Sequence, residues 1–291
     1  MNPSQNLLLN SKKYYLLLAS IVILYAINGY LTYLFSPDIS RVFGFENLNT
    51  FFNKQLLSFL AGISIIFVLS HLNRATWFNR LGATVFVGSL LLLITMLFAP
   101  SSLTPYTGGK KMFLVIGSIS INPMLFFAIG SLWLISWIDS IKKNIKYTNV
   151  TIVTLMVITA FFCLEFHNVS MLLMLEVVFI SIAFYLNGVN KFIILGLIGS
   201  LGLGIIYILM AEHRMLRIKS WLQLSSDYMI NLSTQNALHE NTLLSLINSF
   251  GALSLVFVIA LFLLIAYLIL NHDYTNKSYK IFTVGVVFLL L

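Results

Sequence analysis

Long apolar runs alternate with short polar segments along almost the whole chain, and this pattern predicts its secondary structure. The first run, Tyr14 to Phe35, has 22 residues, enough for a helix to cross a hydrocarbon core of ~30 Å at ~1.5 Å per residue. The pattern predicts eight helices, with a ninth starting near Ile281. The eight runs are Tyr14 to Phe35, Gln55 to Leu72, Leu81 to Ala99, Pro123 to Ile138, Val150 to Leu164, Met171 to Leu186, Phe192 to Ala211 and Leu243 to Leu270.

The runs predict an all-α fold, a polytopic transmembrane helical bundle. They are too long for barrel strands and lack the alternation of apolar and polar residues that barrel strands show. Because Lys12 and Lys13 precede a full-length first run, we expect a retained helix with a cytoplasmic N-terminus. We expect residues 1–291 to form one transmembrane domain that is incomplete at its C-terminus, because the last apolar run reaches Leu291 without a polar flank.

Composition supports a membrane protein and excludes several other classes. The chain is 59% hydrophobic and 9% charged, with a mean hydropathy of +0.95. This leaves too little polar surface for a soluble globule. The net charge of +8 comes from cations between the apolar runs, so it indicates topology and not nucleic-acid binding. The single cysteine, Cys163, excludes a disulfide within the chain.

The distribution of Lys and Arg supports an orientation and points to a binding face. With the N-terminus inside, ten of the 17 cations lie in the cytoplasm and seven outside. Five of the outside cations fall in two loops, 100–122 and 212–241, which suggests an anionic ligand there, although they are also explained as solvated loop charges. The inside cations are Lys12, Lys13, Arg74, Arg80, Lys142, Lys143, Lys146, Lys191, Lys277 and Lys280, and the outside ones are Arg41, Lys54, Lys110, Lys111, Arg214, Arg217 and Lys219.

Two carboxylates stand out. Glu176 lies well inside a predicted helix, so we expect it to point into the bundle, either as a functional group or as a protonated carboxyl bonded to a neighbouring helix. Glu240 precedes the eighth helix on the face that carries the outside cations. Cations at the headgroup level with an acid nearby suit an enzyme that acts on a lipid-linked phosphate.

Several segments, among them Gly108 to Phe113 and the pair Arg214 and Arg217, resemble the FtsW/RodA (SEDS) family of cell-wall glycan polymerases. Gly108-Gly-Lys-Lys-Met-Phe113 and the Asn122-Pro123 pair are similar to that family's Gly-Ala-Arg-Arg-Trp segment and to the Gln-Pro that opens its fourth helix. Leu186-Asn-Gly-Val-Asn-Lys191 resembles its Ala-Gly-Val turn, and Arg214 with Arg217 matches its paired arginines. Further similar segments are Phe51 to Leu57, Leu69 to Arg74 with Trp77, and His239 to Leu243 with Phe250-Gly251.

The chain also departs from the family pattern. Glu165-Phe-His-Asn-Val-Ser170 stands where the family has Gln-Pro-Asp-Leu-Gly-Thr, and Tyr228 to His239 is shorter than the family's glycine-rich stretch. The family's catalytic aspartate falls on Glu240 in an ungapped alignment, or on Asn241 if the histidines are matched. Glu240 also suits helix capping.

The resemblance implies a peptidoglycan glycosyltransferase that polymerises undecaprenyl-pyrophosphate-linked disaccharide at the outer face of a bacterial inner membrane, in division or elongation. Glu240 would be the base, while Lys110, Lys111, Arg214 and Arg217 would bind the pyrophosphate. A class B penicillin-binding protein transpeptidase is the implied partner, and no cofactor or metal is required. The alternatives are a non-catalytic scaffold of the division or elongation machinery and a lipid flippase or transporter.

Overall fold

The computed structural model consists of two compact units. One unit combines Met1–Leu72 with Leu216–Asn271, and the other combines Asn73–Met215 with His272–Leu291. The expectation of a single domain over residues 1–291 stays a prediction. The structure describes residues 13, 15–27, 29, 56–57, 59–65, 74–107, 110–116, 119–142, 144–187, 191, 194–199, 202, 205, 252–272 and 276–290.

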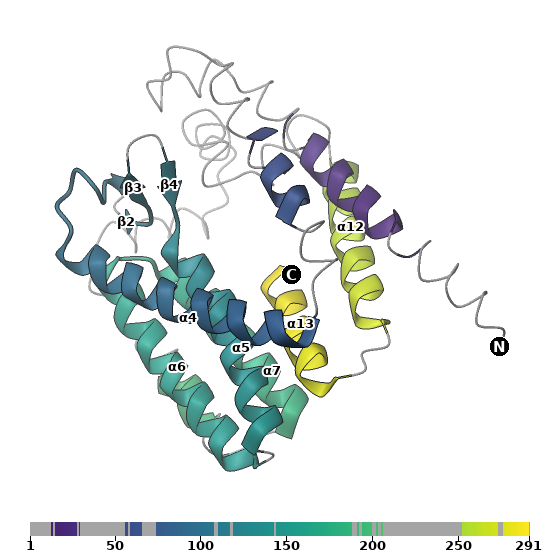
Figure 1. Cartoon of the computed structure of the whole chain (residues 1–291). Helices are drawn as coiled ribbons and strands as arrows, with labels where there is room; N and C mark the ends of the chain where they lie inside the picture. The colour runs from purple at the N-terminus through teal and green to yellow at the C-terminus, as the bar shows by residue number, and fades with distance from the viewer. Residues whose placement is uncertain are drawn as a thin grey trace. The chain divides into compact units, whose positions relative to one another are not determined.

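The second unit is a helical bundle built around α5 (Figure 1). Helix α5 packs against α4, α6 and α13, while α7 packs against α6 and α13. All five helices correspond to predicted apolar runs, but α4 begins at Arg74 and not at Leu81, and α5 continues beyond Ile138 to Lys142. Their bounds are α4 Arg74–Phe98, α5 Pro123–Lys142, α6 Ile145–Glu165, α7 Val169–Asn187 and α13 Lys277–Leu290.

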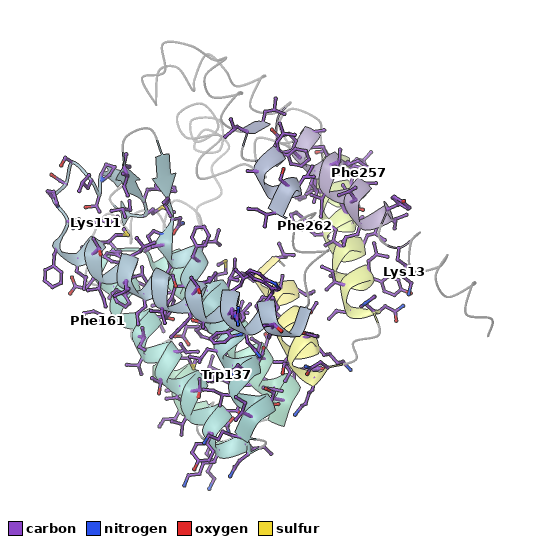
Figure 2. The ribbon with its side chains drawn as sticks, in the orientation of Figure 1. Lys13, Lys111, Trp137, Phe161, Phe257 and Phe262 are labelled. Carbon is purple, nitrogen blue, oxygen red and sulfur yellow. The ribbon has the colours of Figure 1, made fainter. Side chains whose placement is uncertain are left out.

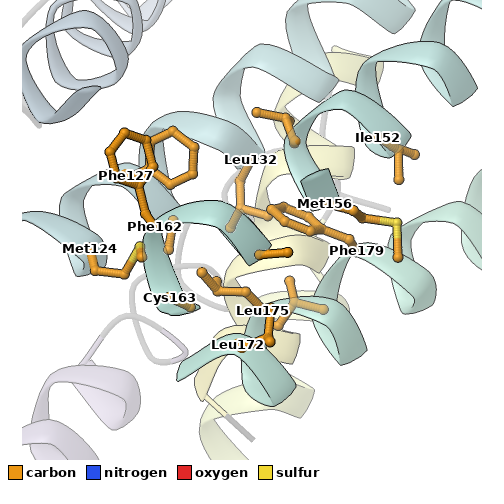
Figure 3. Packing of buried hydrophobic residues seen from close by; sticks show 14 of the residues in the cluster. Met124, Phe127, Leu132, Ile152, Met156, Phe162, Cys163, Leu172, Leu175 and Phe179 are labelled. Atoms are coloured by element: carbon orange, nitrogen blue, oxygen red, sulfur yellow. The ribbon is translucent and has the colours of Figure 1, made fainter. Parts of the chain in front are cut away.

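The bundle has one contiguous apolar core and an apolar exterior. Phe127, Leu132 and Phe179 are buried where α5, α6 and α7 meet (Figure 3). Side chains that face outward are also apolar, for example Val157 on α6 and Val177 on α7, which are 64% and 60% exposed. Lipid solvates such an exterior, so burial of apolar surface contributes little between these helices and close packing must hold them together.

Small residues provide that close packing. A Cβ atom built on Gly130 of α5 would lie 2.6 Å from the Cα atom of Phe86 on α4. A Cβ atom on Gly285 of α13 would lie 2.7 Å from Leu132 Cδ2. These glycines let neighbouring helices approach more closely than any larger residue would allow.

The segment between α4 and α5 contains short strands that the apolar pattern did not predict. Strand β1 (Tyr106–Thr107) pairs antiparallel with β2 (Lys110–Lys111), and β3 (Leu114–Ile116) pairs antiparallel with β4 (Ile119–Ile121). The strands lie at the end of the bundle where α4 ends and α5 begins (Figure 1). The bundle itself is all-α as predicted.

In the first unit, the N-terminal helical residues 15–27 pack on α12 (Ala252–Leu270). Val258 of α12 is buried against Leu24 and Ile27. The ring of Tyr25 stacks on that of Phe59 at 4.0 Å between centroids. The predicted first, second and eighth runs are therefore helical over the residues that the structure describes.

Four of the described helices are long and apolar enough to cross a membrane. Two shorter apolar helices, Tyr15–Ile27 and Met171–Leu186, add to them. In the predicted seventh run, residues 194–199 are helical. These helices indicate a multi-pass helical membrane protein. The four long spans are Thr76–Phe98, Pro123–Lys142, Ile145–Glu165 and Leu253–Leu270.

Candidate functional site

The hairpin that carries the lysine pair is fixed to the turn between α6 and α7. The backbone N–H of Lys111 in β2 donates to the carbonyl oxygen of Phe166 at 3.0 Å. A second backbone hydrogen bond, from Val115 to Leu103 at 2.7 Å, closes the segment on itself, and the Leu114 side chain is buried. The half-buried Lys111 therefore has a defined position at one end of the bundle (Figure 2).

The α6–α7 turn is a tight connection. The N–H of His167 donates to Leu164 O at 3.1 Å, and that of Asn168 donates to Cys163 O at 2.8 Å, the two bonds of a Schellman motif. His167 has a φ of 57°, where glycine is the usual residue. The Asn168 side chain then accepts from Met171 N at 3.4 Å and caps α7.

Helix α5 starts beside this turn and fits the expected Asn-Pro opening. Asn122 Oδ1 accepts a hydrogen bond from Met124 N at 3.2 Å, and Pro123 is the first residue of the helix. Proline is favourable there because its φ is already helical and no N–H is lost. The predicted start of the helix at Pro123 is confirmed.

An ion pair at the opposite end of the bundle was not predicted from the sequence. Asp139 lies in the last turn of α5, and its Oδ2 atom is 2.7 Å from Lys277 Nζ at the start of α13. Thr148 Oγ1 donates to the other carboxylate oxygen at 3.4 Å. The predicted topology puts Lys142 and Lys277 on the cytoplasmic face of the membrane and Lys111 on the outer face. The Asp139–Lys277 ion pair and the Lys111–Phe166 hydrogen bond lie at opposite ends of the bundle, which agrees with this topology.

Glu176 lies inside the bundle, as expected from its position in an apolar helix. It is 4% exposed on α7. The inward orientation is confirmed. The choice between a functional group and a hydrogen-bonded protonated carboxyl stays open.

Two of the five predicted site residues fall in the described part of the chain. Lys110 and Lys111 form β2, which the contact with Phe166 fixes at the α6–α7 end. Arg214, Arg217 and Glu240 lie outside the described residues. The predicted convergence of the two cation clusters therefore stays a prediction. Among the described residues, no three His, Cys, Asp or Glu side chains group as metal ligands would.

Known proteins share this sequence pattern and this fold. Over 181 residues the chain is 29% identical to a protein named "Probable peptidoglycan glycosyltransferase FtsW" from Helicobacter pylori strain 26695, covering 59% of this chain and 47% of the relative. The protein of the same name from strain J99 is 28% identical over 181 residues, and the match again covers 59% of this chain and 47% of the relative. The chain thus spans about half the length of the curated relatives it matches.

Solved structures with this fold include those of Thermus thermophilus rod shape determining protein RodA. A point mutant matches with a TM-score of 0.66 at 14% identity, covering 94% of this chain and 80% of that one. The unmutated protein matches with a TM-score of 0.62 at 15% identity, covering 92% and 79%. At these identities the likeness shows the fold alone.

The fold and the helix pattern together define a polytopic helical membrane protein. Residues 15–244 match the family of FtsW, RodA and SpoVE, described as cell cycle proteins. The chain belongs to this SEDS family, as its motifs indicated.

Proposed function

We propose that this chain is a peptidoglycan glycosyltransferase that polymerises lipid-linked disaccharide at the outer face of the bacterial inner membrane, in division or elongation. The observation that carries the proposal is the family match over residues 15–244, together with relatives named for this activity. The donor sugar arrives already activated by its pyrophosphate, so the reaction needs positioning, a base and charge stabilisation.

The reaction requires a proton acceptor and an anion site. An acceptor sugar hydroxyl attacks the anomeric carbon of the donor, its oxygen forms the new glycosidic bond, and its proton passes to Glu240. The bond between the anomeric carbon and the pyrophosphate oxygen breaks, and undecaprenyl pyrophosphate leaves with the electron pair. Lys110, Lys111, Arg214 and Arg217 stabilise the leaving group's charge.

The hairpin contact supports the anion site. A cation stabilises a leaving group best when its backbone is held in place, because the site is then organised before the reaction. The hydrogen bond from Lys111 N to Phe166 O supplies such support for β2. Spin labels on the 100–122 and 212–241 loops test the convergence, and a separation of the clusters by more than about 20 Å, over two Debye lengths, contradicts a shared site.

A membrane-embedded polymerisation assay tests the function itself. Full-length protein is purified in lipid with its class B penicillin-binding protein transpeptidase, the partner that we propose, and is given lipid-linked disaccharide. We expect glycan chains longer than the substrate. A scaffold would instead retain the partner without making glycan, and that outcome contradicts the proposal.

A further inference from the structure

Two hydroxyl groups inside the bundle differ from most other helical hydroxyls in the described residues. The usual arrangement is a bond to the helix's own backbone, as in Ser136 Oγ to Leu132 O at 2.7 Å and Thr154 Oγ1 to Val150 O at 2.8 Å. Ser131 on α5 and Thr159 on α6 are fully buried, and their hydroxyls have no hydrogen-bond partner among the described residues. Their hydroxyls are therefore available to another group.

These hydroxyls lie at the same depth as the buried acid Glu176. Counting from the ends of their helices at Pro123, Glu165 and Val169, a rise of ~1.5 Å per residue puts Ser131 at ~12 Å, Thr159 at ~9 Å and Glu176 at ~10 Å. All three helix ends lie on the hairpin side of the bundle. Helix α6 packs against both α5 and α7. The three side chains therefore lie at about the same level of the bundle, on neighbouring helices.

Thr159 and Glu176 are buried on helices that pack against each other, α6 and α7. Thr159 and Cys163 are four residues apart on α6 and so share one face of that helix. Cys163 is buried in the apolar cluster where α6 packs against α7, so this face of α6 points into the bundle. Cys163 and Leu175, the residue before Glu176, lie in the same buried cluster (Figure 3).

We propose that Ser131, Thr159 and Glu176 bind one water molecule inside the bundle. Buried polar groups in a membrane interior need partners, and a water bridges two to four of them when the site is polar. Two hydroxyls and a carboxyl offer both donors and acceptors. The bound water bridges α5, α6 and α7 and holds each helix at one rotation about its own axis. This site lies below the α6–α7 turn that contacts the hairpin.

Matched substitutions on the same helices test this site. Thr159→Val removes one ligand of the water, whereas Thr154→Val removes an exposed hydroxyl that bonds to its own helix. We expect Thr159→Val to lower the Tm in detergent by roughly 2–4 °C and Thr154→Val to leave it unchanged. Ser131→Ala and Ser136→Ala form a second pair. Both hydroxyls are buried, but that of Ser136 bonds to its own helix and that of Ser131 does not.

A double substitution distinguishes a shared ligand from separate effects. Groups that hold one water are coupled, so Thr159→Val combined with Glu176→Met is expected to lower the Tm by less than the sum of the single shifts. Additive shifts, or equal shifts for Thr159→Val and Thr154→Val, overturn the proposal.

The water is also directly observable, which keeps the proposal testable if a variant fails to fold. A structure that resolves ordered solvent should show one peak within about 3.2 Å of Ser131 Oγ, Thr159 Oγ1 and a Glu176 oxygen. The same peak should persist when sodium is replaced by choline. Direct bonds between the three side chains, or a peak and a Tm that depend on sodium, contradict a water site.

Discussion

Lys277 Nζ lies 2.7 Å from Asp139 Oδ2, and the two side chains of this ion pair are exposed to very different extents, 68% and 6%. The pair connects the end of α5 to the start of α13, which are 138 positions apart in the chain. Breaking it from either side should therefore have unequal effects.

We expect Lys277→Met to destabilise the protein by about 2 kcal/mol, because among the described residues it leaves the buried carboxylate with Thr148 as its one hydrogen-bond donor, at 3.4 Å. Asp139→Asn leaves a lysine that already reaches water, so its cost should be at most about 1 kcal/mol. Thermal unfolding in detergent measures both. Equal losses from the two variants contradict this asymmetry.

A glycine pair tests the close approach of α4 and α5. Gly130→Ala adds a Cβ atom 2.6 Å from Phe86 Cα, so the helices must separate and the variant should lose about 1–3 kcal/mol. Gly88→Ala on α4 is the matched control, because no atom lies within 4 Å of its new Cβ. The control should be neutral, or more stable by up to about 1 kcal/mol. Similar behaviour of the two variants contradicts the packing.

The α6–α7 turn should tolerate only some residues at position 167. The φ of 57° is strained for a branched side chain and easy for glycine. We expect His167→Val to cost at least about 1 kcal/mol more than His167→Gly in unfolding measurements. A valine variant as stable as the glycine variant would show that this conformation is not required.

Chemical labelling tests the orientation of the chain. Cys163 is fully buried, so a cysteine introduced elsewhere should be the reactive one. In spheroplasts, an impermeant maleimide should label Ser102→Cys, in the exposed segment before the hairpin, and leave Lys142→Cys unlabelled until the membrane is opened. The unmodified chain is the control. Labelling of Lys142→Cys in sealed spheroplasts reverses the topology.

Much of the bundle could be predicted because membrane-spanning helices carry their signal locally. The apolar runs located α5, α6 and α7 to within a few residues of the bounds observed. Asp139 was missed because the predicted helix ended at Ile138, the last apolar position before this charged residue. Its partner Lys277 comes from a distant segment, and spacing along the chain cannot show such a pairing.

The hairpin had a weak signal that the apolar pattern does not capture. Gly108 and Gly109 separate Thr107 from its partner Lys110, and a glycine pair between short strands is typical of a two-residue β-turn. The contact of Lys111 with Phe166 could not be foreseen, because it depends on the Schellman turn that brings the Phe166 carbonyl to the hairpin.

The polymerase that we propose depends on a carboxylate base at position 240. Glu240→Gln keeps the shape and much of the hydrogen bonding but removes the base. In the lipid-linked disaccharide assay, we expect a folded variant that binds substrate and polymerises at least ~10²-fold more slowly. A helix-capping role would cost at most ~1 kcal/mol of stability and leave the rate near normal. Glycan synthesis at the unmodified rate by Glu240→Gln would show that Glu240 is not the base.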